Sequence, residues 1–261
     1  MNDALYIAAT GMQAQQLNVD TIANNLANVN TPGFKKARVS FQDMMYREAV
    51  RPAPALTPAD GQARMGSGVN VAGTTRNFTT ADFTKTDSPL DVAIQGDGFI
   101  EVTMPDGSAA YTRGGSLQVD RDGMLATAQG RVLKASIHVP QDTQVFSIGA
   151  DGKVAATSAG QTTATELGQI DVARFTNASA LMPLGDGLYR PTGASGDART
   201  SHPGDDGSGT LAQGYVESSD VQLVDEMVQL MIAQRAYEVS TKVIQASDEM
   251  MQMTNNLRRG S

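Results

Sequence analysis

The residue types that most often perform chemistry are few and scattered in this sequence. Cysteine is absent, which excludes a disulfide framework, a zinc–thiolate site and a thiol nucleophile. The two histidines, His138 and His202, lie far apart, so a shared metal site would need the fold to bring them together. Residues 120–123 (DRDG) lack the spaced acids and the closing glutamate of a calcium loop. We interpret them as a turn.

Phosphate-binding and nucleophile motifs are missing as well. Residues 66–68 (GSG) lack the third glycine and the strand–helix context of a dinucleotide fingerprint. The sequence contains neither a Walker-type phosphate loop nor a G-x-S-x-G elbow. Single carboxylates such as Asp82, Asp87 and Asp91 are better interpreted as turn and surface residues than as acid–base pairs. We therefore predict no catalytic residue, no metal ligand and no cofactor, and a protein that is not an enzyme.

The composition favours an elongated, acidic protein. The 261 residues carry a formal net charge of −8 with no basic stripe, which predicts no binding to nucleic acid. Tryptophan is absent and there are only seven Phe and six Tyr, which argues against one large compact core. No apolar run approaches the roughly 18 residues of a membrane span. No basic segment precedes an apolar one near residue 1, so no cleaved signal peptide is expected.

The strongest pattern is a heptad repeat at the start of the chain. One row of apolar residues falls seven apart, at Leu5, Met12, Val19 and Leu26. A second row follows each of these by three residues, at Ala8, Gln15, Ile22 and Val29. Only Asp3 and Asp20 are charged in this stretch. The repeat predicts a helix within residues 1–33 that ends at the TPG sequence of residues 31–33 and that needs a partner helix.

The end of the chain supplies that partner. Within residues 219–261, apolar residues recur at threes and fours, namely Val228, Ile232, Val239, Val243, Ala246, Met250, Met253 and Leu257. We therefore predict that residues 1–33 and 219–261 form two long helices paired as a coiled coil. Everything between them is then an insertion into one helical element.

The insertion divides into an arm and a β domain. Residues 34–70 are predicted to form an extended connecting arm, because residues 46–68 hold three prolines and three glycines and are long for a loop in a compact domain. The apolar residues expected to matter in this arm are Met44, Met45, Tyr46, Leu56 and Met65. Residues 71–218 alternate short apolar runs with turn signals, which predicts antiparallel strands. The predicted fold class is therefore α+β.

Asp-Gly pairs mark the turns of the predicted β domain. Residues 106–107 and 122–123 each separate two strand-like runs, and we expect type I′ hairpin turns there because such turns need positive φ at both central residues. Strands are expected at residues 90–94, 99–102, 110–112, 117–119, 145–148, 154–156 and 170–175.

Two features of the helices leave alternatives open. The methionines of the second helix suit an ordinary core stripe or an adaptable interaction surface. A membrane-surface helix is less favoured, because the polar face carries both signs of charge. The cluster of Asn24, Asn25, Asn28 and Asn30 fits either a helix end with caps and turns or interhelical hydrogen bonds that fix the packing register.

Several motifs along the whole chain resemble those of bacterial flagellar rod and hook proteins. The most specific is residues 23–28 (ANNLAN) followed by residues 31–35 (TPGFK). Residues 10–12 (TGM) with Gln15 fit the same pattern. The others are residues 91–100 (DVAIQGDGFI), 110–117 (AYTRGGSL), 213–221 (QGYVESSDV) and 234–238 (QRAYE). The family ordinarily has asparagine where this chain has Asp220, a departure that leaves a capping side chain in place.

The resemblance implies a structural role. The length and the stretch after residue 46 look like the distal rod type, a subunit of the straight, rigid tube that transmits motor torque across the periplasm to the hook. Implied partners are other copies of the chain, proximal rod and hook proteins, the P- and L-ring proteins, the type III export apparatus and the rod cap. The implied assembly interface comprises the helix residues Leu5, Met12, Val19, Ile22, Asn24, Asn25, Leu26, Asn28, Val228, Ile232, Val239, Val243, Met250, Met253 and Leu257.

Within this resemblance, the terminal helices would form an inner layer of the tube and the β domain an outer one. A proximal rod or hook subunit of the same family is the nearest alternative. A secreted binding module with a coiled-coil stalk, and an enzyme with an unrecognised site in the β domain, are the alternatives from other classes.

Overall fold

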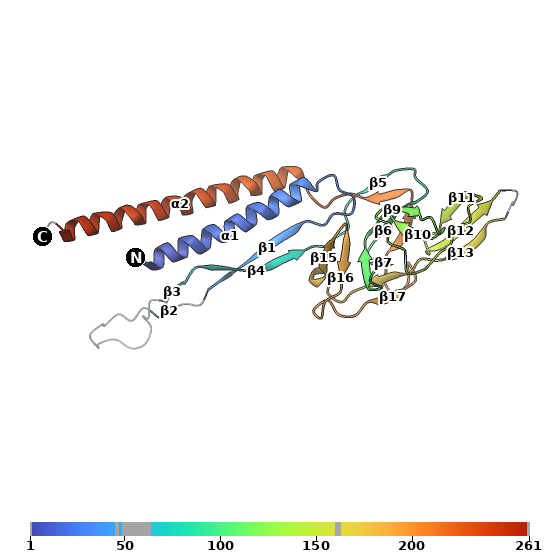
Figure 1. The fold of residues 1–261 in the computed structure, drawn as a ribbon, viewed down its shortest axis with the longest axis horizontal. Coiled ribbons are helices and arrows are strands. Elements are labelled where there is room, and N and C mark those ends of the chain that lie inside the picture. The colour runs from blue at the N-terminus through green and yellow to red at the C-terminus, as the bar shows by residue number, and fades with distance from the viewer. Residues whose placement is uncertain (1, 45–46, 49–63, 160–162, 260–261) are drawn as a thin grey trace. The chain divides into compact units, whose positions relative to one another are not determined.

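Two long helices and a set of antiparallel strands make up the chain, which is α+β (Figure 1). The structure, a computed structural model, describes residues 2–44, 47–48, 64–159 and 163–259. It divides into two compact units, which are taken separately below. Unit 1 comprises Met1–Ala27, Ala37–Thr75 and Gln222–Ser261, and unit 2 comprises Asn28–Lys36 and Arg76–Val221. Neither helix of the described ranges is long and apolar enough to cross a membrane.

The helices of unit 1 lie side by side and run in opposite directions. Helix α1 spans Asn2–Ala27 and helix α2 spans Leu223–Arg259. Near the start of α2, Glu226 contacts Asn25 at the end of α1. Near the middle of α1, Met12 accepts a 3.6 Å hydrogen bond on its sulfur from the Thr241 hydroxyl of α2. The pairing is thus antiparallel, as Figure 1 also shows.

The first helix ends earlier than the sequence pattern predicts. Its last residue is Ala27, four residues before the expected TPG stop. Asn28 begins a turn in which its carbonyl oxygen accepts a 3.1 Å hydrogen bond from the Thr31 amide, and its side-chain oxygen accepts another from the Thr31 hydroxyl. Asparagine side chains compete well with helical hydrogen bonding, so the helix ends where they cluster. Val29 of the second heptad row therefore lies outside the helix.

A narrow β ribbon completes unit 1. Strand β1 (Ala37–Asp43) pairs with β4 (Val69–Arg76), and β1 contacts α1. The short strands β2 (Arg47–Glu48) and β3 (Arg64–Met65) pair antiparallel beyond them. Between the two pairs, the Met44 amide donates a 2.9 Å hydrogen bond to the Gly68 carbonyl. The two ends of the predicted arm are therefore joined to each other by backbone hydrogen bonds.

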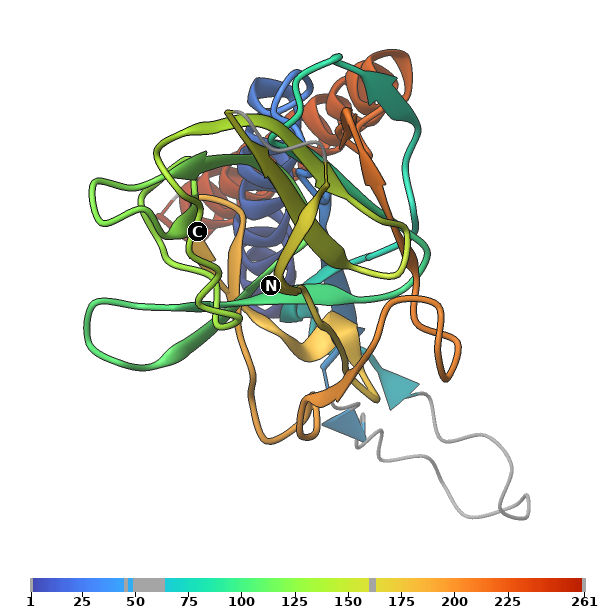
Figure 2. The same ribbon diagram turned by 90° about the vertical axis from the view of Figure 1, so that its right-hand side faces the viewer.

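Unit 2 is built from several small antiparallel sheets (Figures 1 and 2). The largest has the order β15-β16-β8-β7-β14-β17, with strands Met182–Gly185, Leu188–Arg190, Ala109–Thr112, Phe99–Thr103, Val172–Arg174 and Arg199–Ser201. A four-stranded sheet has the order β10-β9-β6-β18, with strands Leu125–Thr127, Gly114–Val119, Asp91–Gln95 and Thr210–Gln213.

Two smaller sheets complete unit 2. One has the order β11-β12-β13, with strands Thr143–Ile148, Lys153–Ser158 and Thr165–Gln169. The other pairs β5 (Phe83–Lys85) with β19 (Tyr215–Glu217), the strand that leads toward α2. A short 3₁₀ helix, η1, covers Ala178–Ala180.

Most predicted strands are confirmed, and their burial explains why. The DVAIQ run of β6 is buried at four of its five positions, because this strand lies inside a sheet and both of its faces are covered. Val92, Ile94, Ile100, Leu125 and Val172 belong to one apolar core that joins the sheets. The expected strand at residues 170–175 is shorter than predicted and is limited to β14.

The two hairpins expected at Asp-Gly pairs form, but with another turn type. Strands β7 and β8 pair antiparallel around Gly107, and β9 and β10 around Gly123. Only the glycine of each pair has positive φ, 79° at Gly107 and 75° at Gly123. The prediction of type I′ turns at these two positions is therefore wrong. The hydrogen bonds from Gly107 to Met104 and from Gly123 to Asp120 close an ordinary turn, and the glycine then supplies the left-handed residue.

Candidate functional site

A buried asparagine ties three segments of unit 1 together. Asn25, at the end of α1, is only 2% exposed. Its side-chain amide donates a 2.9 Å hydrogen bond to the Ala37 carbonyl, and its side-chain oxygen accepts one of 2.9 Å from the Ala37 amide. The amide also donates to Glu226 Oε2 at 3.2 Å. This helix clasp, Asn25 with Ala37 and Glu226, joins α1, β1 and α2 and sets how α1 and α2 are aligned.

The helix clasp decides between the two interpretations of the asparagine cluster, residue by residue. Asn25 makes the interhelical hydrogen bond that the second interpretation predicts. Asn28 forms the turn that follows the helix, as the first predicts. Asn24 is exposed. Neighbouring residues of the same type therefore serve different purposes.

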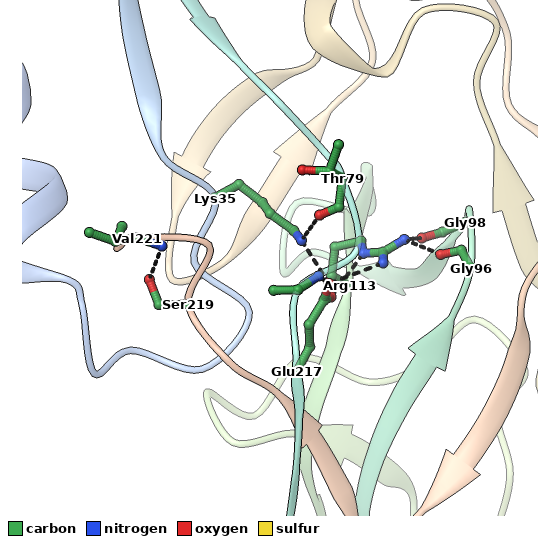
Figure 3. Close-up of polar contacts among 9 residues, drawn as sticks. Lys35, Thr79, Gly96, Gly98, Arg113, Glu217, Ser219 and Val221 are labelled. Carbon is green, nitrogen blue, oxygen red and sulfur yellow. Dashed lines mark hydrogen bonds and ion pairs between the residues drawn. The ribbon is translucent and has the colours of Figure 1, made fainter. Parts of the chain in front are cut away.

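A second buried polar cluster lies in unit 2 and consists of three charged residues (Figure 3). Glu217, the last residue of β19, is 2% exposed; Lys35 and Arg113 are 0% and 3% exposed. Lys35 Nζ donates to Glu217 Oε1 at 2.7 Å and to the Thr79 carbonyl at 2.6 Å. Arg113 Nε donates to Glu217 Oε2 at 3.2 Å, and the Ala81 amide donates to Oε1 at 2.9 Å. We call Lys35, Arg113 and Glu217 the charge clamp.

Arg113 also donates from Nη2 to Glu217 Oε1 at 3.4 Å, and its Nη1 atom binds backbone. Its Nη1 atom donates to the carbonyl oxygens of Gly96 and Gly98 at 2.8 and 2.9 Å. Its guanidinium carbon lies 5.8 Å from the centre of the Phe99 ring, which covers it with a cation–π contact. Arg113 thereby links the loop after β6 to the Glu217 carboxylate. Each of the three nitrogens of its buried guanidinium has a hydrogen-bond partner.

The charge clamp perturbs the titration of two of its members. Burial alone raises the pKa of the Glu217 carboxyl, but the charge of Arg113 and hydrogen bonds from Arg113 and Lys35 outweigh burial, so the pKa lies below its ordinary value of 4.5. Burial lowers the pKa of the Lys35 ammonium below 10.5, against the opposing hydrogen bond and charge of Glu217. Asp220 adds a further negative charge that favours the charged Lys35.

The charge clamp holds together two segments that are distant in sequence. The Gly33 amide donates a 2.8 Å hydrogen bond to the Glu217 carbonyl, and the Asp220 amide donates one of 3.1 Å to the Phe34 carbonyl. Just beyond, the Val221 amide donates to the Ser219 hydroxyl at 3.3 Å (Figure 3). The chain segment that follows α1 and the one that precedes α2 are therefore fixed side by side.

Three of the four residues in the inner row of α2 have small side chains. Glu226, Ala233, Ser240 and Ser247 are spaced at heptads, and all but Ser240 are buried. Ser240 lies opposite Gly11 of α1. A Cβ atom added to Gly11 would lie 4.0 Å from the Ser240 hydroxyl oxygen. Small residues at facing positions let two helices approach closely. Larger residues flank this row and are half-buried, namely Leu230, Ile244 and Met251.

The large apolar residues of α2 lie on a different face. Ile232 is 56% exposed and Val239 is 60% exposed. At 3.6 residues per turn these two residues lie within about 20° of each other around the helix axis, and about 60–120° from Ala233 and Ser247. This exposed face of α2 comprises Val224, Met227, Val228, Met231, Ile232, Val239, Val243, Met250 and Met253. The expectation that this row packs on the first helix within the chain is therefore wrong, because small residues occupy that position.

The predicted residues of α1 are divided between two environments. Leu5, Met12, Val19 and Leu26 are half-buried, and Ile22 of the second heptad row is buried at 5% exposure. The apolar row of α1 is thus partly covered by its own chain, whereas that of α2 is not. The side chain of Leu257 lies outside what the structure describes.

Only part of the predicted arm is described. Met44 is half-buried and its amide continues the ribbon. The backbone of Met65 belongs to β3. Gly68 lies against α1, because a Cβ atom added to Gly68 would lie 2.5 Å from the Thr10 hydroxyl oxygen. Met45, Tyr46 and Leu56 fall outside the described residues.

Sequence reasoning missed the charge clamp. Lys35, Arg113 and Glu217 are separated by long stretches of chain, and no spacing rule connects them. Each nevertheless lies inside one of the quoted motifs, TPGFK, AYTRGGSL and QGYVESSDV. The sequence signal that could have indicated these residues is a charged residue inside an otherwise apolar or glycine-rich motif. Within the described residues, no group of three or more His, Cys, Asp or Glu side chains is placed to hold a metal ion.

Comparison with known families matches three parts of the chain. Residues 5–35 match the family described as flagella basal body rod protein. Residues 93–156 match the flagellar hook protein FlgE/F/G D1 domain, and residues 212–257 match the flagellar basal body rod FlgEFG protein C-terminal region. The first and third matches cover most of α1 and α2, and the second covers the middle of unit 2.

Individual relatives match over nearly the whole chain. The flagellar basal-body rod protein FlgG of Buchnera aphidicola (subspecies Schizaphis graminum) is 42% identical over 260 residues, which cover 98% of this chain and 100% of that protein. FlgG of Borreliella burgdorferi is 42% identical over 264 residues, covering 99% and 100%. The rod protein FlgF of Caulobacter vibrioides is 33% identical over 255 residues, covering 96% and 95%.

Proposed function

We propose that this chain, which belongs to the family of flagellar basal-body rod proteins, is a self-assembling subunit of the distal rod. Its membership rests on identity along nearly the full length of the relatives. It is a structural component of the flagellar basal body and not an enzyme. In the proposed assembly, subunits form a straight, rigid helical tube that carries motor torque across the periplasm to the hook.

The observation that carries this proposal is the exposed face of α2. Nine large apolar side chains are exposed on a helix whose inner row is already packed on α1. So much exposed apolar surface along one helix is characteristic of an interaction site. The contacts between copies are proposed to be heterologous, with this face of one subunit meeting a different surface of the next, and such contacts give an open helical polymer when the rotation does not close.

We propose that α1 and α2 form a coiled coil that is the inner layer of the tube. The heptad spacing of Ala233, Ser240 and Ser247 and the facing Gly11 support close packing between them. Residues 1–33 and 219–261 would then form the inner domain, and residues 71–218 the outer one. On the inner domain, Leu5, Met12, Val19, Leu26 and Leu257 complete the proposed interface.

The arm is proposed to lock neighbouring subunits. Residues 34–70 would lie against adjacent copies, so that the lattice cannot compress on one side and extend on the other. The pairing of β1 with β4 supports a defined direction for this arm. Deletion of residues 47–64 is expected to give curved or flexible polymers in electron micrographs. Unchanged straight rods would show that the arm is only a spacer.

The proposed partners follow from the same assignment. They are other copies of the chain, proximal rod and hook proteins at the two ends, the surrounding P- and L-ring proteins, and the type III export apparatus and rod cap during assembly. The distal position rests on the length and on the proline- and glycine-rich stretch after residue 46. The identities of 42% with FlgG and 33% with FlgF favour it over a proximal position.

A matched pair of variants tests the interface. Ile232→Asp places a carboxylate in the middle of the exposed face of α2, and burying it unpaired between subunits would cost several kcal/mol per subunit. Rods and motility should be lost while the purified subunit keeps its circular dichroism. Val145→Asp, at a residue of similar exposure (59%) on β11, is the control and should leave rods intact. Normal rods from Ile232→Asp would refute the interface.

A further inference from the structure

Exposed methionine is concentrated on one helix. The chain has 13 methionines, and among those whose side chains the structure describes, five are exposed. Four of these five are on α2, with exposures of 50–61%, and all belong to its exposed face: Met227, Met231, Met250 and Met253. The fifth, Met182, is 54% exposed on β15 of unit 2. The exposed face of α2 therefore carries four methionine side chains that are half exposed or more.

A thioether differs from the valine and isoleucine side chains beside it because it can be oxidised. Its sulfur lone pair attacks the outer oxygen of a peroxide, the O–O bond breaks, and an S–O bond forms. The sulfur is oxidised to the sulfoxide and the peroxide is reduced to water or an alcohol. The product is polar and a strong hydrogen-bond acceptor, so it no longer suits a dry apolar contact.

We propose that Met227, Met231, Met250 and Met253 form a peroxide-sensitive modification site that controls assembly. The inference rests on the proposed function, because oxidation of this face matters only if the face binds neighbouring copies. In the free subunit these four side chains are 50–61% exposed. Their oxidation places sulfoxides along the stripe, and the modified subunit is excluded from the polymer. Once assembled, the same residues are covered and protected.

The pattern of exposure gives the proposal internal controls. Met182 has the same exposure but lies on a strand of unit 2, so it should oxidise equally fast without any effect on assembly. Met12 is half-buried on α1 and its sulfur accepts the hydrogen bond from Thr241, so it should oxidise more slowly. Met104 and Met124 are half-buried in unit 2 and should also react slowly.

The first experiment measures reactivity. The purified full-length subunit is treated with dilute hydrogen peroxide, and sulfoxide at each methionine is followed by peptide mass spectrometry. The four α2 methionines and Met182 are expected to react several-fold faster than Met12, Met104 and Met124. Equal rates at all these positions would overturn the proposal, because no selective site would exist.

The second experiment measures the consequence in cells of the source bacterium whose own copy of the gene has been deleted. A variant with all four methionines replaced by glutamine, which is polar like the sulfoxide, should lose rods and motility. The matched variant with four leucines should keep both, and so should Met182→Gln. Circular dichroism of each purified subunit shows whether it is folded.

The outcomes separate this inference from the proposed function. Normal rods from the glutamine variant, together with loss of rods from Ile232→Asp, would overturn the oxidation site and leave the interface intact. Normal rods from both would overturn both. Loss of rods from the leucine variant as well would show that polarity is not the deciding property, which also overturns the proposal.

Discussion

Asn25 and Glu226 lie 201 residues apart in the sequence, and the side-chain amide of Asn25 donates a 3.2 Å hydrogen bond to the Glu226 carboxylate. Both side chains are buried, and Asn25 binds the Ala37 backbone through the same amide group. The two ends of the chain are therefore aligned by one side chain at the end of α1. Alignment matters for a helix pair whose outer face is proposed to meet neighbouring subunits.

The helix clasp predicts a large effect of Asn25→Ala. The substitution leaves the Ala37 amide and carbonyl without their Asn25 partner, at about 1–3 kcal/mol per group, so the loss of stability should be about 2–6 kcal/mol. The measurement is urea unfolding followed by helical circular dichroism, which reports on unit 1. Gln16→Ala, at an exposed position of the same helix, should cost less than about 0.5 kcal/mol. Equal effects of the two substitutions would contradict the assignment.

The charge clamp predicts that Glu217→Gln is severely destabilising. It removes the carboxylate that pairs with both buried cations, Lys35 and Arg113, which costs about 3–5 kcal/mol. Near-ultraviolet circular dichroism of the tyrosines buried in unit 2 follows its unfolding. Glu166→Gln changes an exposed residue of β13 and is the control. A loss below about 1 kcal/mol would show that the clamp carries little of the stability.

Removal of one cation should be milder. Lys35→Met takes away a desolvated ammonium and leaves the neutral pair of Arg113 with Glu217, so it should cost less than Glu217→Gln by about 1 kcal/mol or more. The same tyrosine signal measures it. The opposite order would mean that Lys35, and not the carboxylate, is the centre of the cluster.

The lowered pKa of Glu217 predicts acid sensitivity of unit 2. Between the folded-state pKa and the ordinary value of 4.5, the unfolded chain binds the proton and the folded one does not. The contribution of this residue is therefore complete above about pH 5 and is lost as the pH falls through the folded-state pKa. Unfolding free energy measured from pH 7 down to the acid range should fall more steeply for the unmodified chain than for Glu217→Gln. Parallel curves would contradict this.

Much of the fold follows from local patterns in the sequence. The heptad rows from Leu5 to Leu26 predict α1. The turn-forming Gly and Asp residues between the apolar runs of residues 91–103 predict β6 and β7. These signals are local because helix and strand periodicity depend on neighbouring residues. The hairpins were also predictable, although the turn type was not, since Asp-Gly serves several turns.

The packing of α2 could not be predicted in the same way. Periodicity identifies a hydrophobic stripe but not its partner. The face that packs on α1 carries Ala233, Ser240 and Ser247, whose weak hydrophobic signal is hidden by the larger residues Ile232 and Val239 on a different face. The charge clamp was hidden for a different reason, because its three residues meet only through tertiary structure.

The central claim is that the exposed face of α2 is the surface through which copies of the chain bind one another. A helical reconstruction of assembled rods by electron cryo-microscopy tests it most directly. The account predicts that Val228, Ile232, Val239 and Val243 are covered by helices of adjacent subunits, while Ala233 and Ser247 remain against α1 of their own chain. A map in which these four residues face solvent or the channel would contradict it.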